Sequence, residues 1–203
     1  MSSLRFGKCW RWFGIKWRMA EFITGNRWLS EHEMLVNARY IYRVLTSWGW
    51  TPESVCAMLG NMETESKINP GIWQDLTVNE NMGFGLVQWT PSTKYTSWCS
   101  DRGLEPGHMD SALQRIQWEA VNEEQWIALP EYASMSFAEF SASRLYPEYL
   151  AEIFLRCYER PANQNQPNRG TQARKWYDRL LNTKPITSNK MDLLMLLLVT
   201  NRG

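Results

Sequence analysis

Two glutamates near the end of a predicted helix have the residue type and the setting for acid–base chemistry. Thr51, followed by a proline and an acid, is a helix start signal, and apolar residues recur at helical spacing from there to residue 66. On that helix Glu63 and Glu65 project roughly 160° apart, each near one edge of the apolar face. Spacing alone therefore leaves open which of the two acts.

A glycine-containing segment follows and is expected to face this helix end. Residues 69–81 are polar and turn-rich, and residues 83–89 form a short apolar run. We expect the run to form a small β-hairpin with part of the preceding loop. Gly83 and Gly85 let backbone approach a ligand closely, although glycine can equally serve turn geometry. The pattern predicts a catalytic centre in which a carboxylic acid faces a glycine-lined segment.

Several separated motifs in the chain resemble one group of enzymes. Glu65-Ser66, Asn69-Pro70 and the Gly-x-Gly-Leu-x-Gln run at residues 83–88 resemble goose-type lysozymes and soluble lytic transglycosylases. A longer set of motifs in the chain is still more similar to the lysozyme domain of bacteriophage tail-tip proteins. The motifs that carry this resemblance, at residues 60–62, 65–66, 68–71, 83–91, 158–163 and 165–167, fall within residues 29–181.

The resemblance implies a mainly α (α+β) fold, lysozyme-like, with a small β-hairpin beside the active-site cleft. It also implies a virion protein of the phage tail, with Glu65 as the general acid of a muramidase that opens the host cell wall during entry. To deliver a proton at neutral pH, such an acid needs a pKa raised by a partly apolar setting. Met62, Trp73, Leu86 and Trp89 are available to supply that setting.

A second acidic group would decide how the bond between N-acetylmuramic acid and N-acetylglucosamine is broken. An inverting hydrolase needs a second carboxylate about 6.5–9.5 Å away to activate water. Asp75, our first candidate, and Glu80 lie in the intervening loop, ahead of Glu63, which points to the other side of its helix; the simpler interpretation of each is a solvated acid. Without such a group, a lytic transglycosylase would form 1,6-anhydromuramic ends with Glu65 as acid and then base. A non-catalytic wall-binding tail protein is the third alternative.

Polar residues around the acid are the first candidates for substrate binding. The resemblance places Gln88 in the cleft, where its amide would hydrogen-bond the substrate, and Gly85 on the same segment would allow a close approach. Ser66 and Asn69 would orient the acid or cap the end of its helix.

Three aromatic side chains complete the predicted binding site. Trp73 and Trp89 have rings that can stack on sugar faces, and Tyr158 resembles the cleft tyrosine of lytic transglycosylases. Large aromatics bury much area, so each of the three is also readable as a core residue.

The composition of the chain limits which kinds of partner and cofactor are expected. The chain has 203 residues and a net charge of +1, which argues against nucleic acid as the main partner. The four cysteines are widely spaced and the only histidines are His32 and His108, so no metal site and no cofactor is expected.

The remaining local sequence signals predict where the other helices begin and end. Capping boxes at Ser30 and Ser136 each predict a helix start, as does Pro147. The predicted helices besides the one carrying Glu65 run from Ser30 to Gly49, through Tyr95 and Trp98, from Asp110 to Trp126, from Ser136, from Pro147 to Pro161, and through Ala173 to Leu180.

We expect a catalytic domain over residues 30–183 with a short segment at each end. Residues 1–29 are a basic aromatic arm suited to an anionic membrane surface, or else a poorly ordered arm or a translation start placed before the true one at Met19. Residues 184–203 are a linker and an apolar segment, too short to span a membrane. The apolar segment is expected either to dock on other phage tail proteins or to pack on its own domain.

Overall fold

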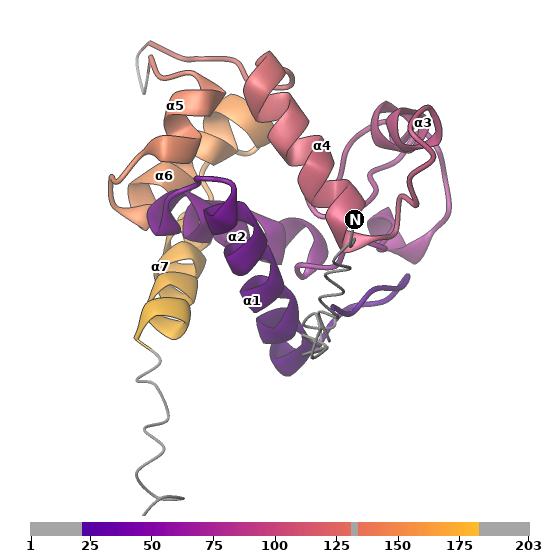
Figure 1. The fold of residues 1–203 in the computed structure, drawn as a ribbon, viewed down its shortest axis with the longest axis horizontal. Helices are drawn as coiled ribbons and strands as arrows, with labels where there is room; N and C mark the ends of the chain where they lie inside the picture. The colour runs from indigo at the N-terminus through magenta and orange to yellow at the C-terminus, as the bar shows by residue number, and fades with distance from the viewer. Residues whose placement is uncertain (1–21, 131–133, 183–203) are drawn as a thin grey trace, which may run out of the picture.

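The computed structural model describes residues 22–130 and 134–182, and these residues are mainly helical (Figure 1). They contain seven α-helices, one short 3-10 turn and one π-helical turn. In order these are α1 (Glu31–Ser47), α2 (Pro52–Ser66), η1 (Gln74–Leu76), α3 (Thr93–Ser100), α4 (Met109–Asn122), α5 (Phe137–Ala142), α6 (Pro147–Phe154), the π turn η2 (Leu155–Glu159) and α7 (Asn168–Leu181).

Helix α2 forms the centre of the core and is buried along most of its length. It packs most extensively against α7 and α6, and also against α1. Gly60 explains the close approach of α7, because a Cβ at this position would lie 2.4 Å from the carbonyl oxygen of Arg169 and 2.7 Å from the nitrogen of Ala173. The first turn of α7 is thereby brought against the C-terminal half of α2.

The predicted helix starts are confirmed where capping signals were strong. Ser30 and Ser136 both form complete capping boxes, and the hydroxyl of Thr51 accepts a hydrogen bond from the backbone N–H of Ser54. Helix α4 differs from the prediction at both ends. His108 is its N-cap in place of Asp110, and the helix ends at Asn122, because Glu123 adopts a left-handed conformation with φ 53°.

The helix predicted from Pro147 to Pro161 changes character part of the way along. It is α-helical to Phe154 and then forms the π turn η2, which ends at Arg160 in a left-handed conformation with φ 48°. A π turn contains an extra residue relative to an α-helical turn, and such turns often occur at functional sites. Here the turn carries Tyr158 and Glu159 to the edge of a groove.

The predicted β-hairpin is wrong for the residues that the structure describes, which contain no β-strand. Phe84 makes isolated bridges with Trp73 and with Trp89 instead. Left-handed residues interrupt any regular ladder, including Asp75 at φ 52° and Gln88 at φ 50°. We call the segment of residues 67–92 the loop wall, because it forms one side of that groove.

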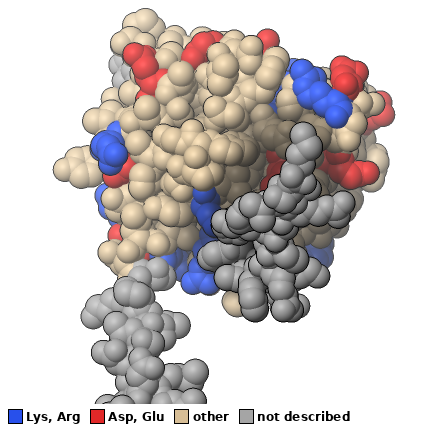
Figure 2. All heavy atoms as spheres, in the orientation of Figure 1, with Lys and Arg blue, Asp and Glu red and all other residues tan. Residues whose placement is uncertain are grey.

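Residues 22–29, which the sequence assigned to the N-terminal arm, lie against the domain. The backbone N–H of Ile23 donates to the side-chain oxygen of Asn37 at 2.7 Å, and Leu29 is buried. The predicted membrane contact of residues 1–21 and the predicted docking of the apolar C-terminal segment fall outside the described residues. Of the helices that are described, none is both long and apolar enough to cross a membrane. On the face shown in Figure 2, acidic and basic side chains are interspersed among uncharged ones.

Candidate active site

A groove of about 500 Å³ lies between the end of α2, the loop wall and the π turn η2. Six residues predicted for the site line it together, whereas Ser66, Asn69 and Gly85 are not among its lining residues. The six are Glu65, Trp73, Asp75, Gln88, Trp89 and Tyr158.

The two glutamates near the end of α2 have different environments. The side chain of Glu65 lines the groove and is 21% exposed. Glu63 lies on the other side of the helix, where its carboxylate accepts hydrogen bonds from Lys175 Nζ at 2.7 Å and from Trp176 Nε1 at 2.8 Å. Glu63 therefore ties α2 to α7, and Glu65 is the glutamate of this helix that faces the groove.

Arg169, in the first turn of α7, is the partner of Glu65. Its Nη2 lies 2.5 Å from Glu65 Oε1, and its side chain is only 4% exposed. The same guanidinium donates to Asn61 Oδ1 at 3.0 Å and to Gln166 Oε1 at 2.8 Å. The sequence predicted an apolar setting for Glu65, and Arg169 was missed. A guanidinium at this distance stabilises the ionised carboxylate.

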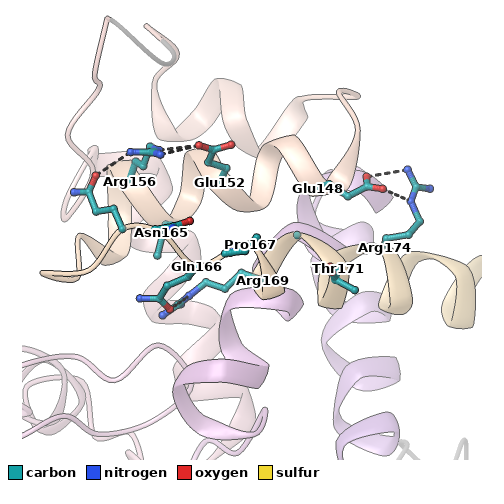
Figure 3. A pocket seen from close by; sticks show the side chains of 12 residues that line it. Glu148, Glu152, Arg156, Asn165, Gln166, Pro167, Arg169, Thr171 and Arg174 are labelled. Atoms are coloured by element: carbon teal, nitrogen blue, oxygen red, sulfur yellow. Dashed lines mark hydrogen bonds and ion pairs between the residues drawn. The ribbon is translucent and has the colours of Figure 1, made fainter.

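Arg169 also borders a second pocket, of about 540 Å³, between α6, the loop of residues 164–167 and the start of α7 (Figure 3). Ion pairs join the elements around this pocket. Glu148 of α6 accepts two hydrogen bonds from Arg174 of α7, and Arg156 bonds to Glu152. These contacts hold the beginning of α7, and with it Arg169, against α6.

Glu159 places a second carboxyl group next to Glu65. Part of the residue reaches solvent and lines the groove, but its Oε1 is buried and has no hydrogen-bond partner among the described residues. Burial first, and then the negative charge of Glu65, raises the pKa of the Glu159 carboxyl well above its usual value, although Arg169 acts in the opposite direction. Glu159 was missed as a site residue, although it stands in the motif at residues 158–163 that carried the resemblance.

A third carboxyl group, Glu119 of α4, lies behind the groove and is completely buried. Its Oε1 accepts from Arg115 Nε at 2.8 Å and from Trp89 Nε1 at 3.0 Å, and its Oε2 accepts from the hydroxyl of Tyr158 at 2.5 Å. Burial raises the pKa of Glu119, and it also raises that of Tyr158 well above its usual value. The polar atoms of Trp89 and Tyr158 are therefore used inside the protein, and both residues are almost entirely buried.

Ser66 and Asn69 connect the end of α2 to its surroundings. The hydroxyl of Ser66 lies within hydrogen-bond distance of the carbonyl oxygens of Met62 and Leu86, at 3.0 and 2.8 Å. Asn69 donates to the carbonyl oxygens at positions 25 and 27 and accepts from the backbone N–H at position 71. Both residues are fully buried, so their polar groups position the loop wall.

The remaining predicted residues belong to the loop wall itself. Trp73 lines the groove with its ring centroid 4.6 Å from that of Phe84. The amide nitrogen of Gln88 donates to the carbonyl oxygen of Gly85 at 2.9 Å. Gly85 has φ 82°, and a Cβ there would lie 3.2 Å from Trp89, so glycine is required by the backbone and by that ring. Asp75 is exposed at the rim.

The residues described contain no group of three histidine, cysteine, aspartate or glutamate side chains that could hold a metal ion. Cys56, Cys99 and Cys157 are buried thiols. The groove is lined by the carboxyl groups of Glu65, Asp75 and Glu159, by the cationic side chains of Lys94 and Arg160, and by aromatic rings.

Comparison with known proteins identifies the family. Residues 36–180 match the family described as phage tail lysozyme. Morphogenesis protein 1 of Bacillus phage B103 is 56% identical over 160 residues, which cover 78% of this chain and 43% of that relative. The chain thus spans less than half the length of the relative. The matched region includes every element that forms the groove, and the chain belongs to the phage tail lysozyme family.

Proposed function

We propose that this protein is a muramidase that cleaves the bond between N-acetylmuramic acid and N-acetylglucosamine in peptidoglycan, with Glu65 as the general acid. The observation that carries the proposal is the different placement of the two glutamates near the end of α2. Glu63 is engaged with α7, whereas Glu65 lines a groove together with aromatic side chains in a chain of this family.

The groove provides what proton transfer to a glycosidic oxygen requires. Glu65 reaches it from the end of a rigid, buried helix, which fixes the position of the acid relative to the substrate. Trp73 offers a ring on the loop wall against which a sugar can stack. Arg169 bonds to Glu65 in the structure, so we expect this contact to change when Glu65 donates its proton.

Asp75 is the proposed second carboxylate for a hydrolytic reaction. It lies on the loop wall, across from the end of α2, and it would activate the attacking water. Its exposure at the rim also favours an alternative, lytic transglycosylation, because that reaction uses the muramic acid's own hydroxyl and needs no second carboxylate. In the alternative, Glu65 acts first as acid and then as base.

A pair of isosteric variants tests the role of Glu65. Glu65→Gln is expected to lower the rate of peptidoglycan solubilisation by about 10²–10⁴-fold, the usual contribution of a positioned general acid. The matched control is Glu63→Gln on the same helix, which should keep activity within a few-fold of the original protein if the folded fraction is equal. Undiminished activity of Glu65→Gln would eliminate both mechanisms. An inactive original protein that still binds wall would indicate the non-catalytic alternative.

The products separate hydrolysis from transglycosylation. Mass analysis of the released muropeptides distinguishes reducing ends from 1,6-anhydro ends, which differ by one water. Hydrolysis with Asp75 as base predicts reducing ends and a large loss of rate in Asp75→Asn. Anhydro ends together with an active Asp75→Asn protein would establish the transglycosylase alternative.

The family and the relative from phage B103 support a location in the phage tail, from which the enzyme would act on the host wall. Docking of the apolar C-terminal segment on other tail proteins and surface contact of the N-terminal arm with a membrane stay proposals for residues outside the described part. Purified virions provide the test, because the proposal requires the protein to be detected in isolated tails by mass spectrometry.

A further inference from the structure

Three charged side chains from three different helical elements meet beside the groove. Glu65 comes from the end of α2, Glu159 from the π turn η2, and Arg169 from the first turn of α7. We infer that Glu65 and Glu159 share one proton, with Arg169 as their common counter-charge, and that Glu159 is a positioning residue that keeps this proton available to Glu65. The inference rests on the proposed role of Glu65 as general acid.

The charges at this position are balanced only when the pair of carboxyls holds one proton. With both carboxyls ionised, two negative charges would face one guanidinium, and the buried Oε1 of Glu159 would carry charge without a hydrogen-bond partner. With both protonated, the guanidinium of Arg169, whose side chain is 4% exposed, would lack a counter-charge. One proton on the pair gives a neutral set of three groups.

The surrounding charges preserve this balance. Glu119 of α4 adds negative potential near Glu159, but Glu119 is itself bonded to Arg115. Arg160, the next residue in the chain, acts on Glu159 in the opposite direction, and its Nη1 is held by the carbonyl oxygens of Gln125 and Cys157. Within the described residues, Arg169 is thus a cation that pairs with Glu65 and also acts on Glu159.

The contact between Arg169 and Glu65 decides where the proton lies. While Arg169 is bonded to Glu65, the proton resides on Glu159, whose pKa is raised by burial and by the charge of Glu65. If Arg169 moves its contact to Glu159, the Glu159 carboxyl loses its proton and the Glu65 carboxylate gains it. The total charge of the three groups does not change, so the transfer avoids the cost of creating a buried charge. Glu65 then faces the groove in the form that a general acid needs.

The variant Glu159→Gln tests this arrangement, because it keeps the size of the side chain and removes the shared proton. Glu65 and Arg169 would then remain as a simple ion pair, and a proton would reside on Glu65 only in more acidic solution. The alkaline limb of the pH–activity profile for peptidoglycan solubilisation should therefore move by about one pH unit or more toward acid, a tenfold or greater loss on that limb. Activity at acidic pH should stay close to that of the original protein.

Two controls separate this effect from a loss of structure. Glu124→Gln changes an exposed glutamate outside the groove and should leave the profile unchanged. Glu159→Asp retains a titratable carboxyl and should restore part of the shift. An alkaline limb of Glu159→Gln that coincides with that of the original protein, whether the rates are equal or uniformly lower, would overturn the inference.

A second measurement needs neither substrate nor activity. Infrared spectra of the full chain at neutral pH should contain a band that belongs to the buried, protonated Glu159 carboxyl and is lost in Glu159→Gln, whether or not Glu119, whose pKa burial also raises, contributes a band of its own. An unchanged spectrum in that variant would also overturn the inference. If Glu65→Gln proves active, the proposed function fails, yet the infrared result still reports whether the pair holds a proton.

Discussion

The helical wall of the groove joins charged groups from distant helices, whereas the polar side chains of the loop wall bond mainly to backbone groups. By helical wall we mean the residues 61–65, 158–160 and 169, where Arg169 links Asn61, Glu65 and Gln166. In the loop wall, the polar side chain of Gln88 bonds to backbone carbonyl groups. The helical wall is therefore held by a buried ionic network, and the loop wall by hydrogen bonds that fix its backbone conformation.

This difference predicts different consequences of substitution. A change in the helical wall leaves a buried charge without its partner, which affects both the protonation of Glu65 and the stability of the fold. A change in the loop wall affects the shape of the groove, and its cost comes from lost hydrogen bonds or from backbone strain.

The largest effect is expected for Arg169→Met. The substitution removes the counter-charge of Glu65 and leaves the Asn61 side chain without its donor, so we expect a loss of about 3–5 kcal/mol in the free energy of unfolding. Urea denaturation followed by circular dichroism measures it. Arg179→Met is the control, because Arg179 pairs with Glu31 at the surface and should cost at most about 1 kcal/mol. Equal losses of unfolding free energy in the two variants would contradict a buried network at Arg169.

A smaller loss is expected for Asn69→Ala in the loop wall. The side chain of Asn69 is fully buried and makes three hydrogen bonds to backbone groups, so its removal should cost about 2–3 kcal/mol. Asn79→Ala, which removes one hydrogen bond at an exposed position, serves as the control. The same denaturation experiment compares them, and an Asn69→Ala protein as stable as the Asn79→Ala protein would show that these bonds do not hold the loop wall.

Next in size is Gly85→Ala, which tests backbone shape without removing any polar group. A side chain at φ 82° is strained, and the new Cβ would press on Trp89 at 3.2 Å, so about 2 kcal/mol of destabilisation is expected. Gly103→Ala has φ 64° with open space around it and should show only the backbone part, about 1 kcal/mol. The difference between their urea midpoints isolates the contact with Trp89, and no difference would contradict it.

The same contrast explains how much of the structure the sequence could predict. Helix starts at Ser30, Thr51 and Ser136 were predicted because their capping signals are local. The π turn after Phe154 was not predicted, because a continuous apolar helical pattern carries no signal for an extra residue. The hairpin was wrong because left-handed residues other than glycine, such as Gln88, interrupt pairing that composition alone favoured.

The sequence predicted several residues that line the groove, but not the charged groups around Glu65. The helix end and the loop that carry the Glu65 motif lie together in one groove. Arg169 reaches Glu65 because α7 crosses α2 at Gly60, a contact between segments more than 100 residues apart that no local pattern contains. Glu159 is placed by the π turn η2, which the helical pattern did not predict either. Such charge networks become visible only when the packing of the helices is known.

The smallest predicted effect is a change in stability at Arg27 and Glu33, which lie outside the loop wall and support it. Arg27 accepts a hydrogen bond from Asn69 at its carbonyl oxygen, and its guanidinium pairs with Glu33 at the start of α1. Arg27 first, and then the backbone and side chain of Ser30, lower the pKa of the Glu33 carboxyl from 4.5 to about 2. A lowered carboxyl pKa in the folded state stabilises the fold fully above the ordinary value and loses that effect as the pH falls toward 2.

Glu33→Gln tests this support by its dependence on pH. The variant should have a slightly lower Tm than the original protein at neutral pH, because the exposed ion pair with Arg27 is lost. The difference should then shrink as the pH falls from 4.5 toward 2, since the original protein protonates Glu33 over that interval and the glutamine cannot titrate. A Tm difference that stays constant or grows across this range would show that Glu33 is not held as a carboxylate by Arg27. The anchoring of the loop wall would then depend on the buried Asn69 alone.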